Sequence, residues 1–306
     1  MSTVVFVLVP GVHILDLAGP SQVFSFANDF GYEYMQCYVG ERAEVPTAQG
    51  LALQAATTWP SLSPDDLVVV PGWRTLSTFG DSNAVGAKFL AELRTHHVRG
   101  GTVASVCAGA EMLGRAGLLD GRRCTTHHNL QDDLARRYPR ATVVRDVLFT
   151  VDDRIVTSAG IASGIDLALH LVTTRHGPAV AAKIARAMVI YARRNGDEQQ
   201  ASAMLRHRSH LNDVVHRVQD IIDTRFASTL RLSDLARSAG VSERTLTRLF
   251  AEAIGTTPLR YQQMLRLERA ENLIGHGESV EAAARTVGFE DARMLRRLRA
   301  RSLESV

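Results

Sequence analysis

The chain has 306 residues, of which 45% are hydrophobic and 22% charged, and its formal net charge is only +3. This composition is ordinary for a soluble globular protein, and the length predicts two domains rather than one. No apolar run approaches the roughly 20 residues that span a bilayer, and residues 1–6 are typical of a strand rather than a signal peptide. These features argue against a membrane partner and against secretion, so we expect a cytoplasmic protein.

Short apolar runs alternate with helical patterns in the first half of the chain. The continuous apolar runs, which are typical of strands buried on both faces, lie at 4–9, 67–72 and 102–106. The helical patterns lie at 21–28, 83–96 and 108–116, and a hairpin at 147–157 precedes two further helices at 163–175 and 179–194. This alternation predicts an α/β domain with a mostly parallel, flavodoxin-like sheet flanked by helices.

The composition changes near Asn195, where a run of polar and turn-forming residues begins. We therefore expect a first domain at 1–194, a linker at 195–211, and an all-α domain at 212–306, which shows no strand pattern. The positive charge is concentrated late in the chain, since residues 204–306 hold 17 arginines against 13 acidic residues. This excess is compatible with nucleic-acid binding but too modest to establish it.

The all-α part contains an internal repeat, in which residues 232–241 resemble residues 280–289. Each copy is expected to form a short helix, a tight turn at a glycine (Gly240 or Gly288) and a second helix. Ser242 is a suitable N-cap for the second helix of the first copy. The pattern predicts two helix-turn-helix units, and the second helix of such a unit enters the major groove of DNA.

The second helix of each unit is expected to present a polar face to the bases. In the first unit, Leu246, Leu249 and Phe250 should pack inward. The outward residues, which are the candidate DNA-binding residues, are Arg244, Thr247, Arg248, Arg293, Arg296 and Arg297. An arginine in such a position can bridge guanine O6 and N7. A long helix at 258–274 would hold the two units about 34 Å apart, which is one turn of DNA.

This region resembles the AraC/XylS family of transcription regulators over residues 212–301. Besides the repeat, the stretches 255–261 and 287–289 carry the resemblance. Arg299 departs from the family, which has an aromatic residue there, and this weakens the match of the second unit. The resemblance implies a regulator that binds double-stranded DNA and acts with RNA polymerase, and we expect a homodimer because such proteins commonly read paired half-sites. The alternative is a plain helical bundle with an arginine-rich face.

Cys107 follows the apolar run at 102–106 and precedes a helix that begins at Ala108, so it occupies a sharp strand-to-helix turn. This is the position of a nucleophile elbow, and the start of the helix would favour a thiolate. Asp16 follows the first strand at the same sheet edge, where ligands of open α/β sheets bind, and His127 is a candidate base. An ionised Asp16 would oppose the thiolate, but we expect Cys107 to be partly thiolate near neutral pH.

These residues resemble the ThiJ/PfpI branch of the glutamine-amidotransferase-like superfamily, and the resemblance covers residues 3–194. The stretches that carry it are 9–11, 15–20, 71–72, 105–109 and 157–160. By this resemblance Cys107 is the nucleophile position, Asp16 is its acidic neighbour and His127 is the more relevant histidine. The expected ligand pocket comprises Cys107, Asp16, Gly72, Ala108, His127 and Gly160.

Relatives without a DNA-binding domain include hydrolases and an isocyanide hydratase, whereas relatives fused to an AraC-type domain are regulators, some of which respond to amino-acid-derived metabolites. We therefore predict a regulator rather than an enzyme, with a small-molecule effector bound in the first domain. The alternatives are a cysteine-dependent hydrolase or hydratase with a reduced DNA-binding tail, a redox sensor that uses Cys107, and a cysteine that is merely buried.

No cofactor and no metal are expected. The histidine pairs at 96–97 and 127–128 have no cysteine or carboxylate at ligand spacing. The three cysteines, Cys37, Cys107 and Cys124, are widely spaced and form no CxxC pair, which argues against a disulfide framework or a structural zinc site.

Overall fold

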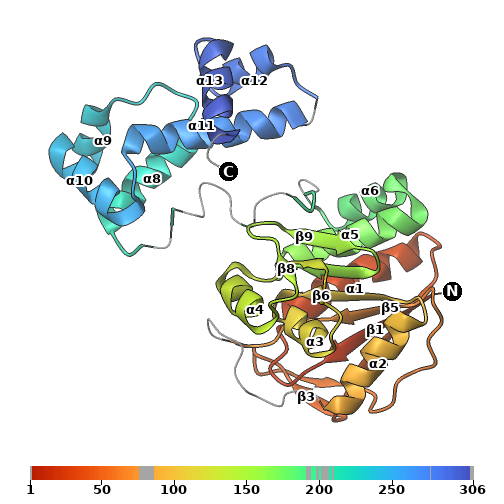
Figure 1. The fold of residues 1–306 in the computed structure, drawn as a ribbon. Helices are drawn as coiled ribbons and strands as arrows, with labels where there is room; N and C mark the ends of the chain where they lie inside the picture. The colour runs from red at the N-terminus through yellow and green to blue at the C-terminus, as the bar shows by residue number, and fades with distance from the viewer. Residues whose placement is uncertain are drawn as a thin grey trace. The chain divides into compact units, whose positions relative to one another are not determined.

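The computed structural model describes residues 2–75, 86–190, 194–197, 200, 207–208, 210–275 and 277–303, the last three residues by their backbone alone. The chain divides into two compact units, residues 1–200 and residues 201–306, both drawn in Figure 1. Part of the second expected helix (83–85) and part of the predicted linker (198–199, 201–206 and 209) lie outside the described residues. The boundaries of the linker therefore stay a prediction.

The first unit is built on a six-stranded sheet with the order β2-β1-β5-β6-β10-β9. Its strands are β1 (Ser2–Leu8), β2 (Tyr34–Gly40), β5 (Leu67–Val70), β6 (Thr102–Val106), β9 (Phe149–Asp152) and β10 (Ile155–Ser158). All neighbouring strands pair in parallel except the β9–β10 hairpin, which confirms the mostly parallel sheet. Two separate pairs are formed by β3 (Glu44–Pro46) with β4 (Ala52–Gln54) and by β7 (Arg123–Cys124) with β8 (Thr142–Val143).

Helices flank this sheet (Figure 1). They are α1 (Ile14–Asp29), α2 (Ala87–Val98), α3 (Ala110–Arg115), α4 (Gln131–Arg137), α5 (Ser163–His176) and α6 (Pro178–Ala187), with the 3₁₀ turns η1 (Cys107–Gly109) and η2 (His128–Leu130). The β1–α1–β2 connection runs toward one edge of the sheet and the β5–α2–β6 connection toward the other. Because such crossovers are right-handed, α1 and α2 lie on opposite faces.

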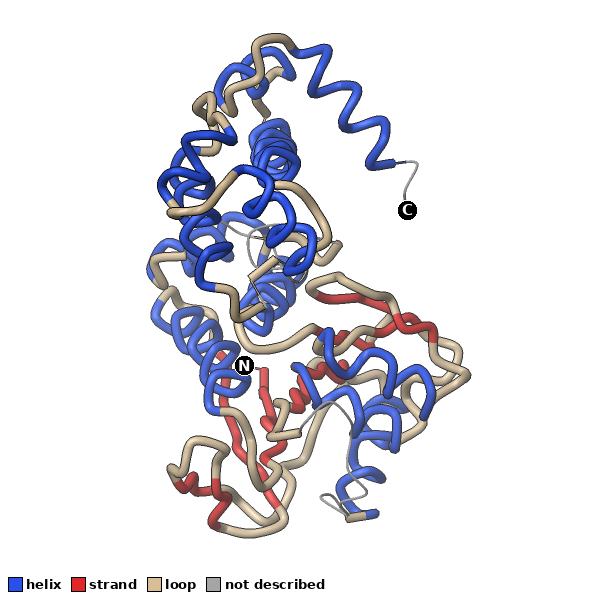
Figure 2. The backbone as a smooth tube through the Cα atoms, turned by 90° about the vertical axis from the view of Figure 1, so that its left-hand side faces the viewer, coloured by secondary structure: helices blue, strands red, loops and turns tan. Residues whose placement is uncertain are grey.

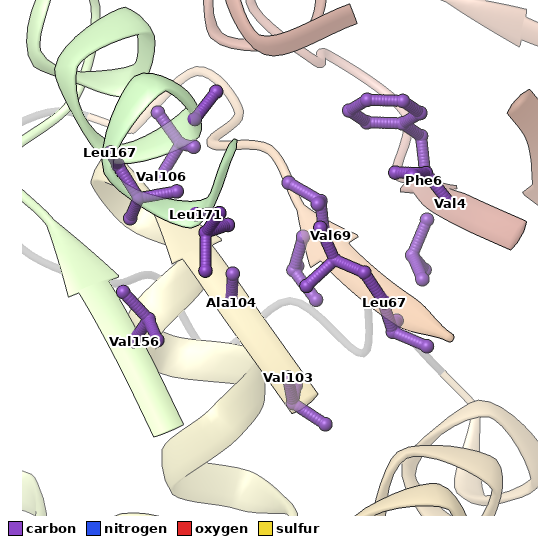
Figure 3. Close-up of a cluster of buried hydrophobic side chains, with 14 of the residues drawn as sticks. Val4, Phe6, Leu67, Val69, Val103, Ala104, Val106, Val156, Leu167 and Leu171 are labelled. Carbon is purple, nitrogen blue, oxygen red and sulfur yellow. The ribbon is translucent and has the colours of Figure 1, made fainter. Parts of the chain in front are cut away.

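Apolar side chains of the central strands form the core of the first unit. Figure 3 shows Leu167 and Leu171 of α5 beside Ala104 of β6 and Val156 of β10, with Val69 of β5 nearby. All five side chains are buried. The continuous apolar runs of the sequence are thus covered on both faces, as the sequence predicts for a parallel sheet.

Several elements of the first unit differ from expectation. Helix α4 and the strands β2, β3, β4 and β8 were not predicted, and α6 ends at Ala187 rather than at residue 194. Helix α1 begins at Ile14 rather than near residue 21, although it contains Pro20, whose missing N–H normally argues against a helix interior. Asp16 therefore lies in the first turn of this helix, not in a loop before it. Strand β2 was not anticipated, because its mixed polar and apolar residues give neither an alternating nor a continuous pattern, and it forms one edge of the sheet.

The described part of the second unit contains helices and connecting turns (Figure 2). Its helices are α8 (Asp213–Arg225), α9 (Leu232–Ser238), α10 (Glu243–Ile254), α11 (Pro258–Gly275), α12 (Val280–Thr286) and α13 (Ala292–Leu303). The side chains of Ser242 and Ser279 cap α10 and α12 by accepting backbone N–H bonds. The repeat is confirmed as two helix-turn-helix units, α9–α10 and α12–α13. No described helix is long and apolar enough to cross a membrane.

The two helix-turn-helix units have separate small cores that meet at the end of α8. The ring of Phe226 packs against both cores. Gln262 and Arg266 of α11 donate hydrogen bonds to the carbonyls of Phe226 and Ser228, which follow the last turn of α8. The Arg266 guanidinium also lies over the ring of Phe289, 5.6 Å from its centre. One arginine thus ties α8, α11 and the second helix-turn-helix unit together.

Candidate functional site

Cys107 occupies a strained turn at the end of β6. Its φ of 55° lies in the left-handed region, which a side chain other than glycine rarely adopts and which is common at functional sites. Strand β10 runs parallel to β6 with Ser158 opposite Val106, so Gly160 follows beside Cys107. A Cβ added at Gly160 would lie 2.9 Å from Cys107 Sγ, and one added at Gly72 would lie 2.8 Å from Cys107 Cβ. Both glycines are therefore needed for the close packing of the turn.

Asp16 is fully buried beside Cys107. Its Oδ1 accepts a hydrogen bond from the Ile161 N–H at 2.6 Å, and a Cβ added at Gly72 would lie 2.5 Å from its Oδ2. Burial raises the pKa of Asp16 above the ordinary value, although the Ile161 N–H and the nearby His13 counteract this. The carboxyl group therefore holds its proton more strongly than an exposed aspartate does.

The thiol of Cys107 is protonated, contrary to the expectation of a partial thiolate. Burial and the charge of Asp16 raise the pKa of Cys107 far above its ordinary value. The N–H of Ala108 at the start of the turn acts in the opposite direction, as the position of the turn predicts, but burial and Asp16 outweigh it.

Histidines lie on the loop after β7 and before α1. The ring of His127 accepts a hydrogen bond from the Asn129 N–H at 3.3 Å, and its centre is 4.1 Å from that of His128. Burial, together with the charges of His128 and His13, lowers the pKa of His127 to about 4, so its ring is neutral at physiological pH. The described residues show no hydrogen bond between His127 and Cys107.

Two residues of this site were missed by the sequence analysis. His13 immediately precedes α1 and affects the titration of both Asp16 and His127. Its position three residues before Asp16, at the same strand end, was an available signal. The buried Thr126 donates its hydroxyl hydrogen to Cys107 O at 2.8 Å. No sequence pattern marked Thr126.

The structure thus gathers five of the six expected pocket residues around one turn: Cys107, Asp16, Gly72, Ala108 and Gly160. His127 lies on a neighbouring loop, which Thr126 connects to the turn. In the part of the chain that the structure describes, no three His, Cys, Asp or Glu side chains gather closely enough to hold a metal ion. The described residues thus place a thiol, a carboxyl group and the imidazole of His127 near one edge of the sheet.

The first recognition helix, α10, presents an exposed basic face. Leu246 and Phe250 are fully buried and Leu249 is partly buried, so Arg244 and Arg248 point outward. Arg248 pairs with Glu252 one turn later at 2.9 Å. Thr247 is half-buried, and its hydroxyl donates to the carbonyl of Glu243 at 2.9 Å, so it is less available than expected.

The second recognition helix, α13, is richer in arginine. Leu295 is fully buried, and Arg293, Arg296 and Arg297 are exposed, as expected. Arg296 pairs with Glu281 of α12. Arg299, which stands where an aromatic residue was expected, lies 3.9 Å from Glu271 of α11.

Together the two halves of the chain define a class of protein, a DNA-binding transcription regulator of the AraC type with an N-terminal α/β sensor domain. The chain belongs to the DJ-1/PfpI family, whose model matches residues 2–174. A second family model, described as a helix-turn-helix domain, matches residues 235–304.

Known proteins resemble both the whole chain and its first half. The HTH-type transcriptional regulator CdhR of Pseudomonas aeruginosa is 28% identical over 289 residues, which cover 93% of this chain and 84% of that protein. The isonitrile hydratase of Pseudomonas putida is 33% identical over 171 residues, which cover 54% of this chain and 68% of the hydratase. A crystal structure of an AraC family transcriptional regulator from Pseudomonas putida matches with a TM-score of 0.52 and 23% identity, covering 61% of this chain and 100% of that chain, and shows the fold.

Proposed function

We propose that the protein regulates transcription through a small metabolite that binds beside Cys107 and changes how α10 and α13 engage DNA. The observation that carries this proposal is the pair of helix-turn-helix units with exposed arginines at corresponding positions. An arginine on such a helix can recognise guanine through two hydrogen bonds. The contacts of Arg266 with the end of α8 and with Phe289 form a joint between the two helix-turn-helix units. This joint supports recognition of two DNA sites at a fixed spacing, because it connects both units to α8 and α11.

The site at Cys107 is proposed to bind its ligand without chemical conversion. Nucleophilic catalysis by cysteine needs a thiolate and a base within hydrogen-bonding distance. Burial and Asp16 raise the pKa of the thiol, and His127 bonds to Asn129 instead. The ligand is a small metabolite, and amino-acid-derived compounds are the first class to screen. Bound ligand raises the thermal stability of the protein by mass action, which makes a thermal-shift screen of the full chain suitable.

Substitution of Arg248 tests DNA recognition. Arg248→Ala should weaken binding to a specific operator by about 1–3 kcal/mol and relax the preference at one base pair. The matched control is Arg237→Ala, because Arg237 is an exposed arginine on the first helix of the same unit and also pairs with an acidic neighbour, Asp234. The control should keep the base preference. Equal losses on the operator and on random DNA would show that Arg248 contacts only phosphate.

The proposed assembly is a homodimer that acts with RNA polymerase at promoters. Paired half-sites match a two-fold protein, and this relation sets the spacing of the half-sites. Sedimentation of the full chain at micromolar concentration, with and without operator DNA, should show a dimer. A monomer under both conditions would contradict this part of the proposal.

A second candidate function is a cysteine-dependent hydration, which the 33% identity to an isonitrile hydratase favours. The test is turnover of an alkyl isonitrile by the full chain and by Cys107→Ser. Turnover that disappears in the variant would establish an enzyme and overturn the binding-only reading of the site. We expect neither protein to consume the isonitrile, because the thiol is held protonated.

A further inference from the structure

Residues 194–200, at the end of the first unit, form hydrogen bonds with the rest of that unit at three positions. The Nε and Nη2 atoms of Arg194 donate to Oδ2 of the buried Asp166 in α5, at 3.1 and 2.6 Å. The carbonyl of Gly196 accepts hydrogen bonds from the N–H groups of Leu148 and Phe149, at 2.9 and 3.1 Å. Gln200 makes the third attachment. The beginning of the predicted linker is therefore held by the first unit itself.

The attachment at Gln200 bridges two loops. Its side-chain Nε2 donates to the carbonyls of Thr126 and Val147, at 3.0 and 3.1 Å, and its backbone N–H donates to Asp146 Oδ1 at 3.1 Å. A carboxamide nitrogen carries two hydrogens, so both carbonyls can be satisfied at once. Gln200 thus holds the loop after β7 and the loop before β9 in one arrangement.

The same loop contacts the Cys107 site. Thr126 is fully buried, and its hydroxyl donates to the carbonyl of Cys107 at 2.8 Å. Its own carbonyl, which Gln200 binds, belongs to the peptide unit that also contains the His127 N–H. Because a peptide unit is planar and rigid, any displacement of the His127 N–H also displaces this carbonyl. Thr126 therefore stands between the site and Gln200.

We propose that Gln200 transmits the state of the Cys107 site to the linker. This inference rests on the proposed function. A ligand that displaces the Cys107 turn or draws in the His127 loop moves the Thr126 carbonyl away from the Gln200 carboxamide. Gln200 then detaches, and the linker gains freedom where it leaves the first unit. Regulation requires two states with different ligand affinity, and the attached and detached states of Gln200 meet that requirement.

Hydrogen exchange in the full chain tests the relay without a known effector or operator. Thr126→Val removes the hydrogen bond to Cys107 and keeps the shape of the side chain. It should speed amide exchange in peptides spanning 194–200 about tenfold, because the attachment opens more often. Gln200→Ala should give a similar rise. Combining both changes should add nothing further, because the two side chains act in one relay.

Two further variants separate a relay from general loosening. Thr126→Ser keeps the hydroxyl and should retain the exchange of the unaltered chain. Thr47→Val makes the same change at another buried threonine, whose hydroxyl accepts the Leu51 N–H, and should leave residues 194–200 unaffected. Unchanged linker exchange in Thr126→Val, multiplying effects in the double variant, or an equal rise in Thr47→Val would refute the relay. Each of these results leaves the DNA-binding test on Arg248 standing, so the two proposals fail separately.

Discussion

Gly240 and Gly288 hold equivalent positions in the two helix-turn-helix units but have different surroundings. Both have positive φ, 71° and 84°. No atom outside the immediate chain lies within 4 Å of a Cβ added at Gly240, whereas a Cβ added at Gly288 would overlap the carbonyl oxygen of Ala227. Replacing each glycine by alanine therefore separates backbone strain, which both variants share, from a steric clash, which affects only one.

The expected magnitudes follow from this difference. An alanine forced into the left-handed region costs about 1–2 kcal/mol, which is the full expected effect of Gly240→Ala. In Gly288→Ala the chain after Phe226 must also move, which adds roughly 1–3 kcal/mol by analogy with overpacked cores, for a total of about 2–5 kcal/mol. The displacement would also disturb the Arg266 contacts at the joint. Binding to a two-part operator should therefore weaken more in Gly288→Ala than in Gly240→Ala.

Calorimetry of the full chain measures the loss of stability. In a helical domain of about 100 residues, each kcal/mol lowers the midpoint of unfolding by roughly 4–8 °C. The transition of the second unit should fall in both variants and fall further in Gly288→Ala, while the transition of the first unit stays in place. A Gly288→Ala variant that is as stable as Gly240→Ala would refute the argument from the Ala227 carbonyl.

The remaining predictions concern titration at the Cys107 site. The raised pKa of Asp16 stabilises the folded state below the usual pKa of 3.8, and this contribution is lost as the pH rises. The free energy of unfolding of Asp16→Asn should therefore increase relative to that of the unaltered chain between pH 4 and pH 7. Equal pH profiles of the two proteins in urea unfolding would contradict this. The same substitution removes a charge that raises the pKa of Cys107. Alkylation of Cys107 by iodoacetamide at pH 8 should therefore become faster. An unchanged rate would show that burial alone sets the pKa of the thiol. The pKa of His127, lowered to about 4, predicts that its NMR signals titrate near pH 4. It also predicts that the folded state loses stability as the pH falls from 6.5 toward 4. An NMR titration midpoint near pH 6.5 would be inconsistent with the burial of the ring.

Much of the fold follows from local patterns in the sequence. The apolar runs at 4–9, 67–72 and 102–106 identify three central strands because a strand covered on both faces needs no polar alternation. The helical repeat is equally visible, because residues 232–241 recur as residues 280–289 with the turn glycines Gly240 and Gly288 in equivalent positions. Strand β2 was missed for the opposite reason: an edge strand is half-covered, and its polar residues obscure the period.

The site was only partly predictable. Strand ends place Asp16, Gly72 and Cys107 at one sheet edge, and topology brings them together without any detail of packing. The protonation of the thiol depends on how completely it is buried and on its distance from Asp16, which no sequence pattern gives. The hydrogen bond from Thr126 to Cys107 could not be predicted either, because a single hydroxyl contact leaves no periodic signal in the sequence.

The distribution of the site along the chain has a consequence for synthesis of the protein. The hydrogen bond from Ile161 to Asp16 joins residues separated by 145 positions, and Gly160 must also be in place before the Cys107 turn can close. All of these residues precede the second unit, which begins at residue 201. At about 5–20 residues per second, a ribosome needs roughly 5–20 s to add the last hundred residues. The first unit can therefore emerge and fold while the second unit is still being made, so the Cys107 site can be complete before the chain leaves the ribosome.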